Sequence, residues 1–226
     1  MYAEVLKMGG ERPEQYEGSA YRPVLDMAWK GLLSKDLDEV ARNAVARRDG
    51  DRLVLRTYGR ECTVDTASHT IRVRDQEPMA AYSILVLHYL AGAREAAPAG
   101  RWISYRQLPG GTAYSNAFKK RTIDEVAALF SRRPELIHRA MGALGGKRLA
   151  FGDASIQLDV FPKLPVAVIL WKGDEEVRGA ANVLFDETAP LHLPVEDLAE
   201  VGSNVLSQLF KAYRTVQDSV VHRNTV

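Results

Sequence analysis

The pattern of hydrophobic and polar positions at the start of the chain predicts two helices. After Pro23, which suits the first turn of a helix, apolar residues recur at helical spacing to Leu33. A second helix is predicted from Asp36, because Glu39 follows three residues later in a capping-box pattern and apolar residues then share one face.

The period of the pattern then changes from helical to alternating. Residues 53–73 alternate between apolar and polar positions with turn residues between the runs, which predicts three short antiparallel strands. Pro78 opens a helix from Met79 to about Ala93 that is apolar nearly all round. A helix of this kind belongs in the centre of a core.

The middle of the chain predicts one strand and two helices. The strand runs from Arg101 to Leu108. A capping box formed by Thr122 and Glu125 predicts the start of the first helix. Pro134 opens the second helix, and Gly145-Gly146 ends it.

The alternating pattern returns in the last third of the chain. Three strands are predicted, with the apolar run 166–171 in the middle, and Pro194 opens a final helix whose apolar stripe extends to Tyr213. The segments 53–93 and 154–213 therefore share the order strand, strand, strand, helix. This pattern predicts an α+β fold of two antiparallel β-β-β-α units, with an internal duplication and a chance likeness as the two explanations.

These elements predict a simple domain organisation. We expect a single α+β domain over residues 21–216, in which a strand and helical connector, 101–146, joins the two units. Residues 1–20 are predicted to be a flexible N-terminal arm, and residues 217–226 a frayed tail.

Composition excludes several classes of protein. Hydrophobic residues make up 46% and charged residues 26% of the 226, as in ordinary globular domains. The longest apolar run, Met79–Ala91, is too short to span a bilayer. The single cysteine excludes an intrachain disulfide and a cysteine-based metal or iron–sulfur site. With no signal peptide recognised at the N-terminus, a cytoplasmic location is predicted.

Charge is balanced overall but divided along the chain. The net charge of +1 argues against general nucleic-acid binding. Residues 94–150 hold eleven basic and four acidic side chains, a net +7, whereas residues 151–200 hold three basic and ten acidic ones, a net −7. This division predicts either complementary faces within the fold, a surface for self-association or a protein partner, or solvated surfaces with no partner.

Three stretches of sequence together carry a resemblance to a known family. They are Trp102–Gly111, Leu164–Glu176 and the pair Leu184–Asp186 with Leu193–Leu198. In combination they resemble the uncharacterised domain-of-unknown-function family numbered 3786, found mainly in anaerobic bacteria and archaea. The resemblance implies an anaerobic source. It implies no activity, cofactor or catalytic residue, and some relatives carry an iron–sulfur module that this chain lacks.

A glycine-rich loop is the first candidate for ligand chemistry. In Pro109–Asn116, glycines allow backbone N–H groups to converge near a predicted helix start, and Arg106 lies beside them. An anion such as phosphate or carboxylate fits such a loop, although Gly-Gly pairs also mark ordinary turns. The residues predicted to bind on this side are Arg106, Gly110, Gly111 and Tyr114.

An acidic turn is the second candidate. Asp174, Glu175 and Glu176 follow Trp171, and Asp186 comes one strand later. Carboxylates would suit a hard divalent ion, but the spacing matches no calcium-binding loop, so no metal ligand is assigned. A lone His88 in the apolar helix is typical of a core residue, with axial ligation of a tetrapyrrole as the alternative.

The two candidates lead to one functional hypothesis and two alternatives. The hypothesis is a small-ligand-binding domain for an anionic or planar cofactor-like molecule, held in a cleft between the glycine loop and a second wall formed by Trp171, Asp174 and Glu176. The alternatives are a metal-dependent enzyme that uses the acidic residues and an accessory module that binds another protein. No catalytic signature stands out, and no cofactor is identified.

Overall fold

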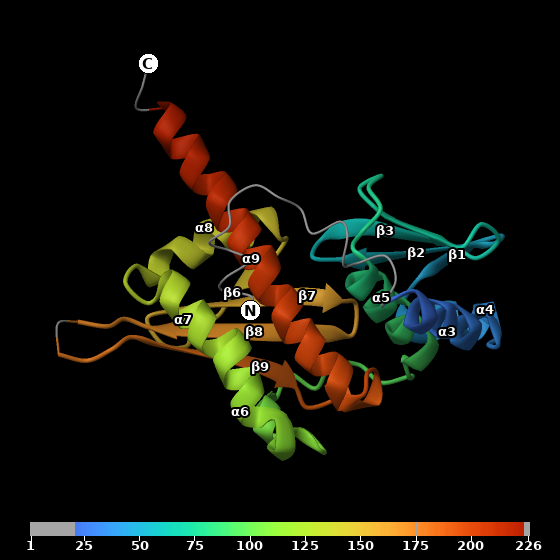
Figure 1. Cartoon of the computed structure of the whole chain (residues 1–226), viewed down its shortest axis with the longest axis horizontal. Helices are drawn as coiled ribbons and strands as arrows, with labels where there is room; N and C mark the ends of the chain where they lie inside the picture. Colours follow the sequence, from blue (N-terminus) through green and yellow to red (C-terminus); the bar gives the residue numbers. More distant parts are fainter. Residues whose placement is uncertain (1–20, 175, 224–226) are drawn as a thin grey trace.

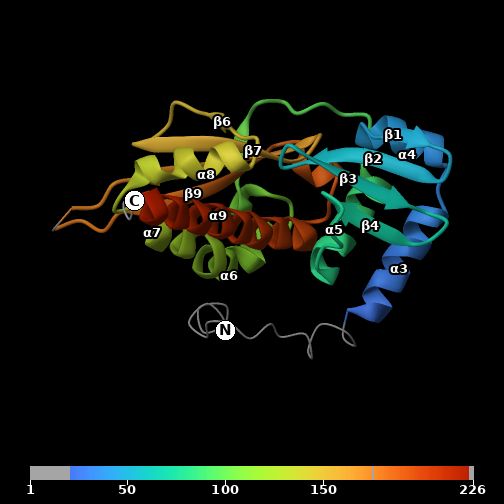
Figure 2. The ribbon, with the colours of Figure 1, turned by 90° about the horizontal axis from the view of Figure 1, so that it is seen from above.

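The computed structural model describes residues 21–174 and 176–223. The predicted arm, residues 1–20, lies outside this range, as do residues 224–226. Two antiparallel sheets lie on one side of the molecule, and most of the helices lie on the other (Figures 1 and 2). Their buried apolar side chains form one continuous core. This arrangement confirms the predicted α+β class.

The N-terminal helices and strands form the first sheet and its cover. Pro23 lies in the first turn of its helix, and the Asp36 carboxylate accepts the Glu39 backbone N–H at 2.8 Å, so both predicted helix starts are confirmed. The sheet has the order β1-β2-β3-β4. The elements are α3 (Arg22–Leu33), α4 (Leu37–Ala44), β1 (Arg47–Asp49), β2 (Arg52–Thr57), β3 (Arg60–Asp65) and β4 (Thr70–Val73).

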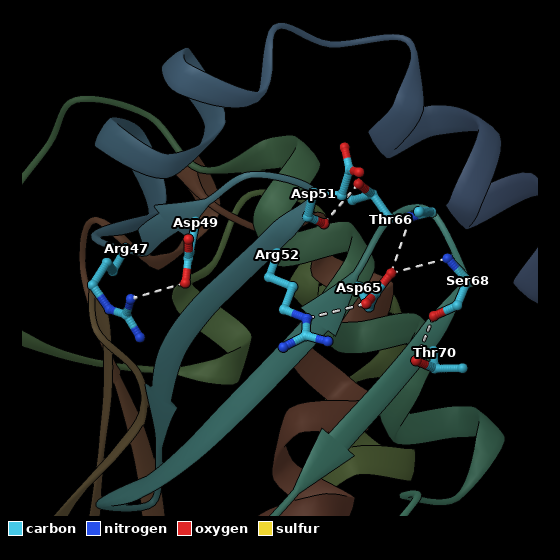
Figure 3. A network of polar contacts seen from close by, with 9 residues as sticks. Arg47, Asp49, Asp51, Arg52, Asp65, Thr66, Ser68 and Thr70 are labelled. Carbon is cyan, nitrogen blue, oxygen red and sulfur yellow. Dashed lines mark hydrogen bonds and ion pairs between the residues drawn. The ribbon is translucent and has the colours of Figure 1, made fainter.

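Charged side chains cover the outer face and rim of the first sheet. Arg52 Nε donates to Asp65 Oδ2 at 3.2 Å across the β2–β3 pair, and Arg47 lies 3.7 Å from Asp49 (Figure 3). Asp65 also accepts backbone N–H groups of the turn into β4. Most of these exposed groups therefore have local partners.

Helix α5 (Ala80–Gly92) connects the first sheet to the second. It is buried along most of its length, as its uniformly apolar sequence predicts. Tyr89 stacks on Phe161 of the second sheet at 4.4 Å between ring centroids, and its hydroxyl donates to the Ala44 carbonyl. The same hydroxyl accepts the Lys163 backbone N–H. Tyr89 thus ties α4 and α5 to the second sheet.

The second sheet has five strands in the order β5-β9-β8-β7-β6. Helices α6, α7, α8 and α9 cover one of its faces (Figure 2). The strands are β5 (Trp102–Ser104), β6 (Lys147–Arg148), β7 (Ala154–Phe161), β8 (Leu164–Trp171) and β9 (Ala180–Asp186). The helices are α6 (Ser115–Phe118), α7 (Asp124–Phe130), α8 (Ile137–Ala143) and α9 (Val195–Arg223), so helical backbone continues beyond Gln217.

Two details of the middle segment differ from the prediction. The strand expected over 101–108 ends at Ser104, because Tyr105–Gln107 turn into a 3₁₀ helix capped by Ser104 and Gln107. Thr122 does not cap a helix: it is buried inside the π-helical turn Lys119–Ile123, which joins α6 to α7 without a break. Phe118 and Thr122 both pack against Gly202 of α9, and this contact favours continued helix over a new start.

The two predicted β-β-β-α units lie in separate sheets that meet at the end of β2. The Tyr58 N–H donates to the Asp159 carbonyl of β7 at 2.9 Å. β1 extends the first meander, and β5 and β6 extend the second, which is why the sheets differ in strand number. An internal duplication stays a hypothesis.

Candidate functional site

The glycine loop is packed against the start of α9. Gly110 has φ +81° and lies against Val195. A Cβ on Gly111 would lie only 1.9 Å from the Tyr105 carbonyl oxygen, so glycine is required there by backbone packing alone. Arg106 and Tyr114 are exposed beside the loop.

The acidic turn closes the β8–β9 hairpin. The Asp174 carboxylate accepts the backbone N–H groups of Glu176 and Val177 at 2.9 and 2.6 Å, and these bonds hold its pKa below the usual value. Trp171 is partly exposed at the end of β8. Asp174 therefore has a structural role in the turn.

The structure does not bring the glycine loop and the acidic turn together. The Gly173 N–H donates to the Ser131 carbonyl at the end of α7, whereas the glycine loop lies at Val195. The hairpin tip projects from one end of the second sheet, away from the start of α9 in both views (Figures 1 and 2). The described residues of the acidic turn adjoin the start of β9, whereas the glycine loop follows β5, which pairs with the end of β9. Ligand binding by each segment separately stays a prediction.

A pocket of about 380 Å³ lies elsewhere, between the first sheet, α5 and α9. It contains none of the seven residues predicted to bind a ligand. Its walls come from the β2–β3 turn, the segment between β4 and α5, the first half of α5, and one side of α9. The lining residues are Thr57, Tyr58, Arg60, Val73, Arg74, Gln76, Glu77, Pro78, Met79, Ala81, Tyr82, Leu85, Glu200, Ser203, Asn204, Ser207, Gln208 and Lys211.

Arg60 is held in the wall of the pocket by neutral acceptors. Its Nη1 donates to Gln208 Oε1 at 3.3 Å, its Nη2 donates to the Ala143 carbonyl at 3.2 Å, and its Nε is buried without a partner. Burial and the neighbouring Arg74 lower the pKa of the Arg60 guanidinium. Within residues 21–174 and 176–223, neither Arg60, Arg74 nor Lys211 forms an ion pair with a carboxylate.

The remaining walls of the pocket combine buried tyrosines with the start of a helix. The Tyr58 hydroxyl donates to Asn204 Oδ1 at 2.7 Å, and the hydroxyls of Tyr82 and Thr57 are hydrogen-bonded to each other. Met79 and Ala81 bring the first turn of α5 to the pocket, and that turn has neither an acidic residue nor a side-chain cap. The dipole of α5 adds positive potential to that of the arginines.

Sequence reasoning missed this pocket although two local signals belonged to it. Tyr58-Gly59-Arg60 lies between two predicted strands and by itself indicates only a turn, and the spacing in the last helix predicts only its apolar stripe. Neither signal identifies a site alone, because the lining residues fall into two groups, 57–85 and 200–211, that are more than a hundred positions apart in the chain.

His88, which the sequence analysis singled out, and His192 each form one hydrogen bond, and the buried His192 Nε2 has no partner among the described residues. His88 Nδ1 lies 2.7 Å from Asp197 Oδ2, and this hydrogen bond raises the pKa of His88. His192 is buried, and its Nδ1 accepts the Arg94 N–H. Burial and the charge of Lys163 lower the pKa of His192 to about 4, so the ring is neutral near pH 7.

The acidic residues do not form a cation site in the described part of the chain. Asp186 is fully buried, and its carboxylate accepts the backbone N–H groups of Ala99, Gly100 and Thr188. Burial raises the pKa of Asp186, but the hydrogen bonds from the Thr188 hydroxyl and these three N–H groups together outweigh burial and lower it. No group of three His, Cys, Asp or Glu side chains arranged to hold a metal occurs among residues 21–174 and 176–223.

Fold and pocket together define the class of this molecule: an α+β protein with two antiparallel sheets and a cation-lined pocket beside its longest helix. The sequence profile of the family described as Domain of unknown function (DUF3786) matches residues 36–208. The chain belongs to this family, which confirms the resemblance carried by the three stretches of sequence. A search of curated proteins and a search of solved structures each found no match. No described helix is long and apolar enough to cross a membrane.

Proposed function

We propose that the protein binds a small organic anion in the pocket between the first sheet, α5 and α9. The observation that carries the proposal is the pair Arg60 and Arg74, two guanidinium groups at one cavity with no carboxylate partner among the described residues. Elsewhere on the first sheet, Arg52 and Arg48 have carboxylate partners (Figure 3 shows Arg52). An anion would relieve the repulsion between Arg60 and Arg74.

The size and walls of the pocket support the same function. Its volume, about 380 Å³, lies within the range of ligand pockets in proteins. Glu77 and Glu200 also line it, so the three cations outnumber the two acids by one. Arg60 is half-buried in the pocket wall, where solvent screens an ion pair less than at an open surface, whereas Arg74 and Lys211 are exposed. A cytoplasmic location and ligand binding by the seven residues singled out in the sequence stay predictions beside this proposal.

Thermal unfolding with inorganic phosphate and sulfate, at constant ionic strength, tests the proposal. A ligand at tenfold its Kd stabilises the folded state by about 1.4 kcal/mol, which raises the melting temperature by a few degrees. Arg74→Asn should abolish this rise. Asn is chosen because Arg74 has φ +50°, and Asn tolerates the left-handed region.

Arg56→Gln is the matched control, since Arg56 is exposed on β2 and does not line the pocket. It should respond to phosphate like the wild type. Arg106→Ala tests the glycine loop in the same assay. The proposal is wrong if no anion shifts the melting temperature, or if Arg74→Asn and wild type shift equally.

A further inference from the structure

Helix α9 presents a continuous polar stripe to the pocket. Glu200, Ser203, Asn204, Ser207, Gln208 and Lys211 recur at helical spacing on one face. The opposite face carries Leu198, Val201, Val205 and Leu209, which are buried in the core. The polar residues of the stripe are half-buried from Ser203 to Gln208, so they are partly removed from water.

Two hydrogen bonds occupy the carbonyl oxygens of the Asn204 and Gln208 side chains, so the NH₂ groups of these amides are available as donors. Arg60 can only donate, so Gln208 turns Oε1 toward it. Tyr58 donates to Asn204 Oδ1. In the described part of the chain, the two amide NH₂ groups have no hydrogen-bond partner. The Ser207 hydroxyl also has none there. The middle of the stripe therefore offers donors that suit hydroxyl or phosphate oxygens.

The stripe is also polarised along the helix axis. The cationic groups lie toward the C-terminal end of the stripe, where Arg60 contacts Gln208 and Lys211 follows one turn later. Glu200 lies about two turns before Gln208. At a rise of 1.5 Å per residue, the eight steps from Glu200 to Gln208 span about 12 Å along the helix axis. A carboxylate at that distance is too far to neutralise the arginine. It can accept hydrogen bonds from hydroxyl groups at the other end of a ligand.

Part of the pocket wall outside α9 is apolar. Pro78, Met79, Ala81 and Leu85 provide aliphatic surface from the start of α5. The aliphatic face of a sugar ring or of a base would pack on such a wall while polar edges contact α9. The pocket thus has an anion end, a hydroxyl end and one apolar side.

We infer that the ligand is a phosphate monoester of a polyhydroxy compound, with its phosphate at Arg60, Arg74 and Lys211 and its hydroxyl groups toward Glu200. This inference rests on the proposed function and names the class of the anion. Sugar phosphates and nucleoside monophosphates share this chemistry, and the experiment distinguishes them.

Isothermal titration of the full chain with four probes tests the inference. The probes are inorganic phosphate, ribose 5-phosphate, adenosine 5′-monophosphate and unphosphorylated ribose. At least one of the two esters should bind roughly 10-fold or more tightly than inorganic phosphate, because hydrogen bonds to a charged acceptor are added. Free ribose should not bind measurably, and the tighter of the two esters identifies the source of the phosphate group.

Substitutions in the protein separate this inference from the proposed function. Glu200→Ala should remove the preference for the ester but keep the binding of inorganic phosphate. Glu196→Ala is the control, because Glu196 is exposed one turn earlier on α9 and does not line the pocket. If inorganic phosphate binds in an Arg74-dependent way but neither ester binds more tightly, the inference fails and the proposed function stands. If no probe binds, both fail.

Discussion

Gly59 and Gly145 face each other across the junction of the two sheets, so closely that neither has room for a side chain. A Cβ on Gly145 would lie 2.9 Å from the Gly59 Cα, and a Cβ on Gly59 would lie 3.0 Å from the Gly145 Cα. Both residues have positive φ, 69° and 60°. This contact holds the β2–β3 turn against the end of α8, and Arg60 follows Gly59 directly. The position of Arg60 in the pocket therefore depends on it.

Gly145→Ala should destabilise the protein. The methyl group would strain a left-handed backbone and would push the β2–β3 turn away, at a cost of about 1–3 kcal/mol in the free energy of unfolding. Urea denaturation measures this loss. Gly142→Ala is the control, because Gly142 lies in α8 with open space around its Cα, and alanine favours helix there. Equal stability of the two variants would contradict the tight contact.

Asp186→Ala should be severely destabilising for a structural reason. It would leave three backbone N–H groups and the Thr188 hydroxyl without their acceptor, at a cost of at least about 3 kcal/mol. Glu187→Ala, which removes only the partner of the exposed Arg101, should have a much smaller effect, because solvent screens an exposed ion pair. If the acidic residues hold no metal ion, a chelator should leave the melting temperature of the wild type unchanged. A drop on chelation would support the acidic residues as metal ligands instead.

The pair His88 and Asp197 predicts stability that depends on pH. The hydrogen bond to Asp197 raises the pKa of His88 above 6.5, so the folded state binds the proton more tightly than the unfolded state. The stabilisation is fully present below pH 6.5 and is lost as pH rises through the raised pKa. Because about a third of the His88 side chain is exposed, we expect only about 1 kcal/mol.

Denaturation of His88→Asn at about pH 5.5 and about pH 9 checks this sign. The deficit of the variant relative to wild type should be larger at the lower pH. A deficit of His88→Asn that is independent of pH would show that the pair stabilises only through packing.

His192 predicts the opposite dependence at acid pH. Its pKa is about 4 in the folded protein against 6.5 for a free histidine, so the unfolded state takes up a proton first as pH falls. The wild type should lose stability between pH 6.5 and about 4. His192→Gln cannot titrate there, and its stability relative to wild type should improve as the pH is lowered through this window. Parallel curves would show that His192 is not the group that titrates.

The local pattern of the sequence determined the elements of this protein and the family to which it belongs. Alternation over 53–73 fixes which face of each strand is buried, because burial of apolar surface follows the period of the backbone, and the uniformly apolar sequence after Pro78 predicts a helix buried along most of its length. The spacing of Asp36 and Glu39 likewise predicts the start of the second helix, where the Asp36 carboxylate accepts the Glu39 N–H. Such signals extend over a few residues only.

Only the tertiary structure decided which helices and strands pack against one another. Thr122 looked like a helix cap, and only its packing against Gly202 shows why the helix continues through it. Arg60 looked like a turn residue, and only the approach of α9 places Gln208 beside it. The periodicity of a strand or helix predicts which side is buried but does not identify the element that packs against it. A pocket built from the β2–β3 turn and α9 could therefore not be predicted from the sequence pattern.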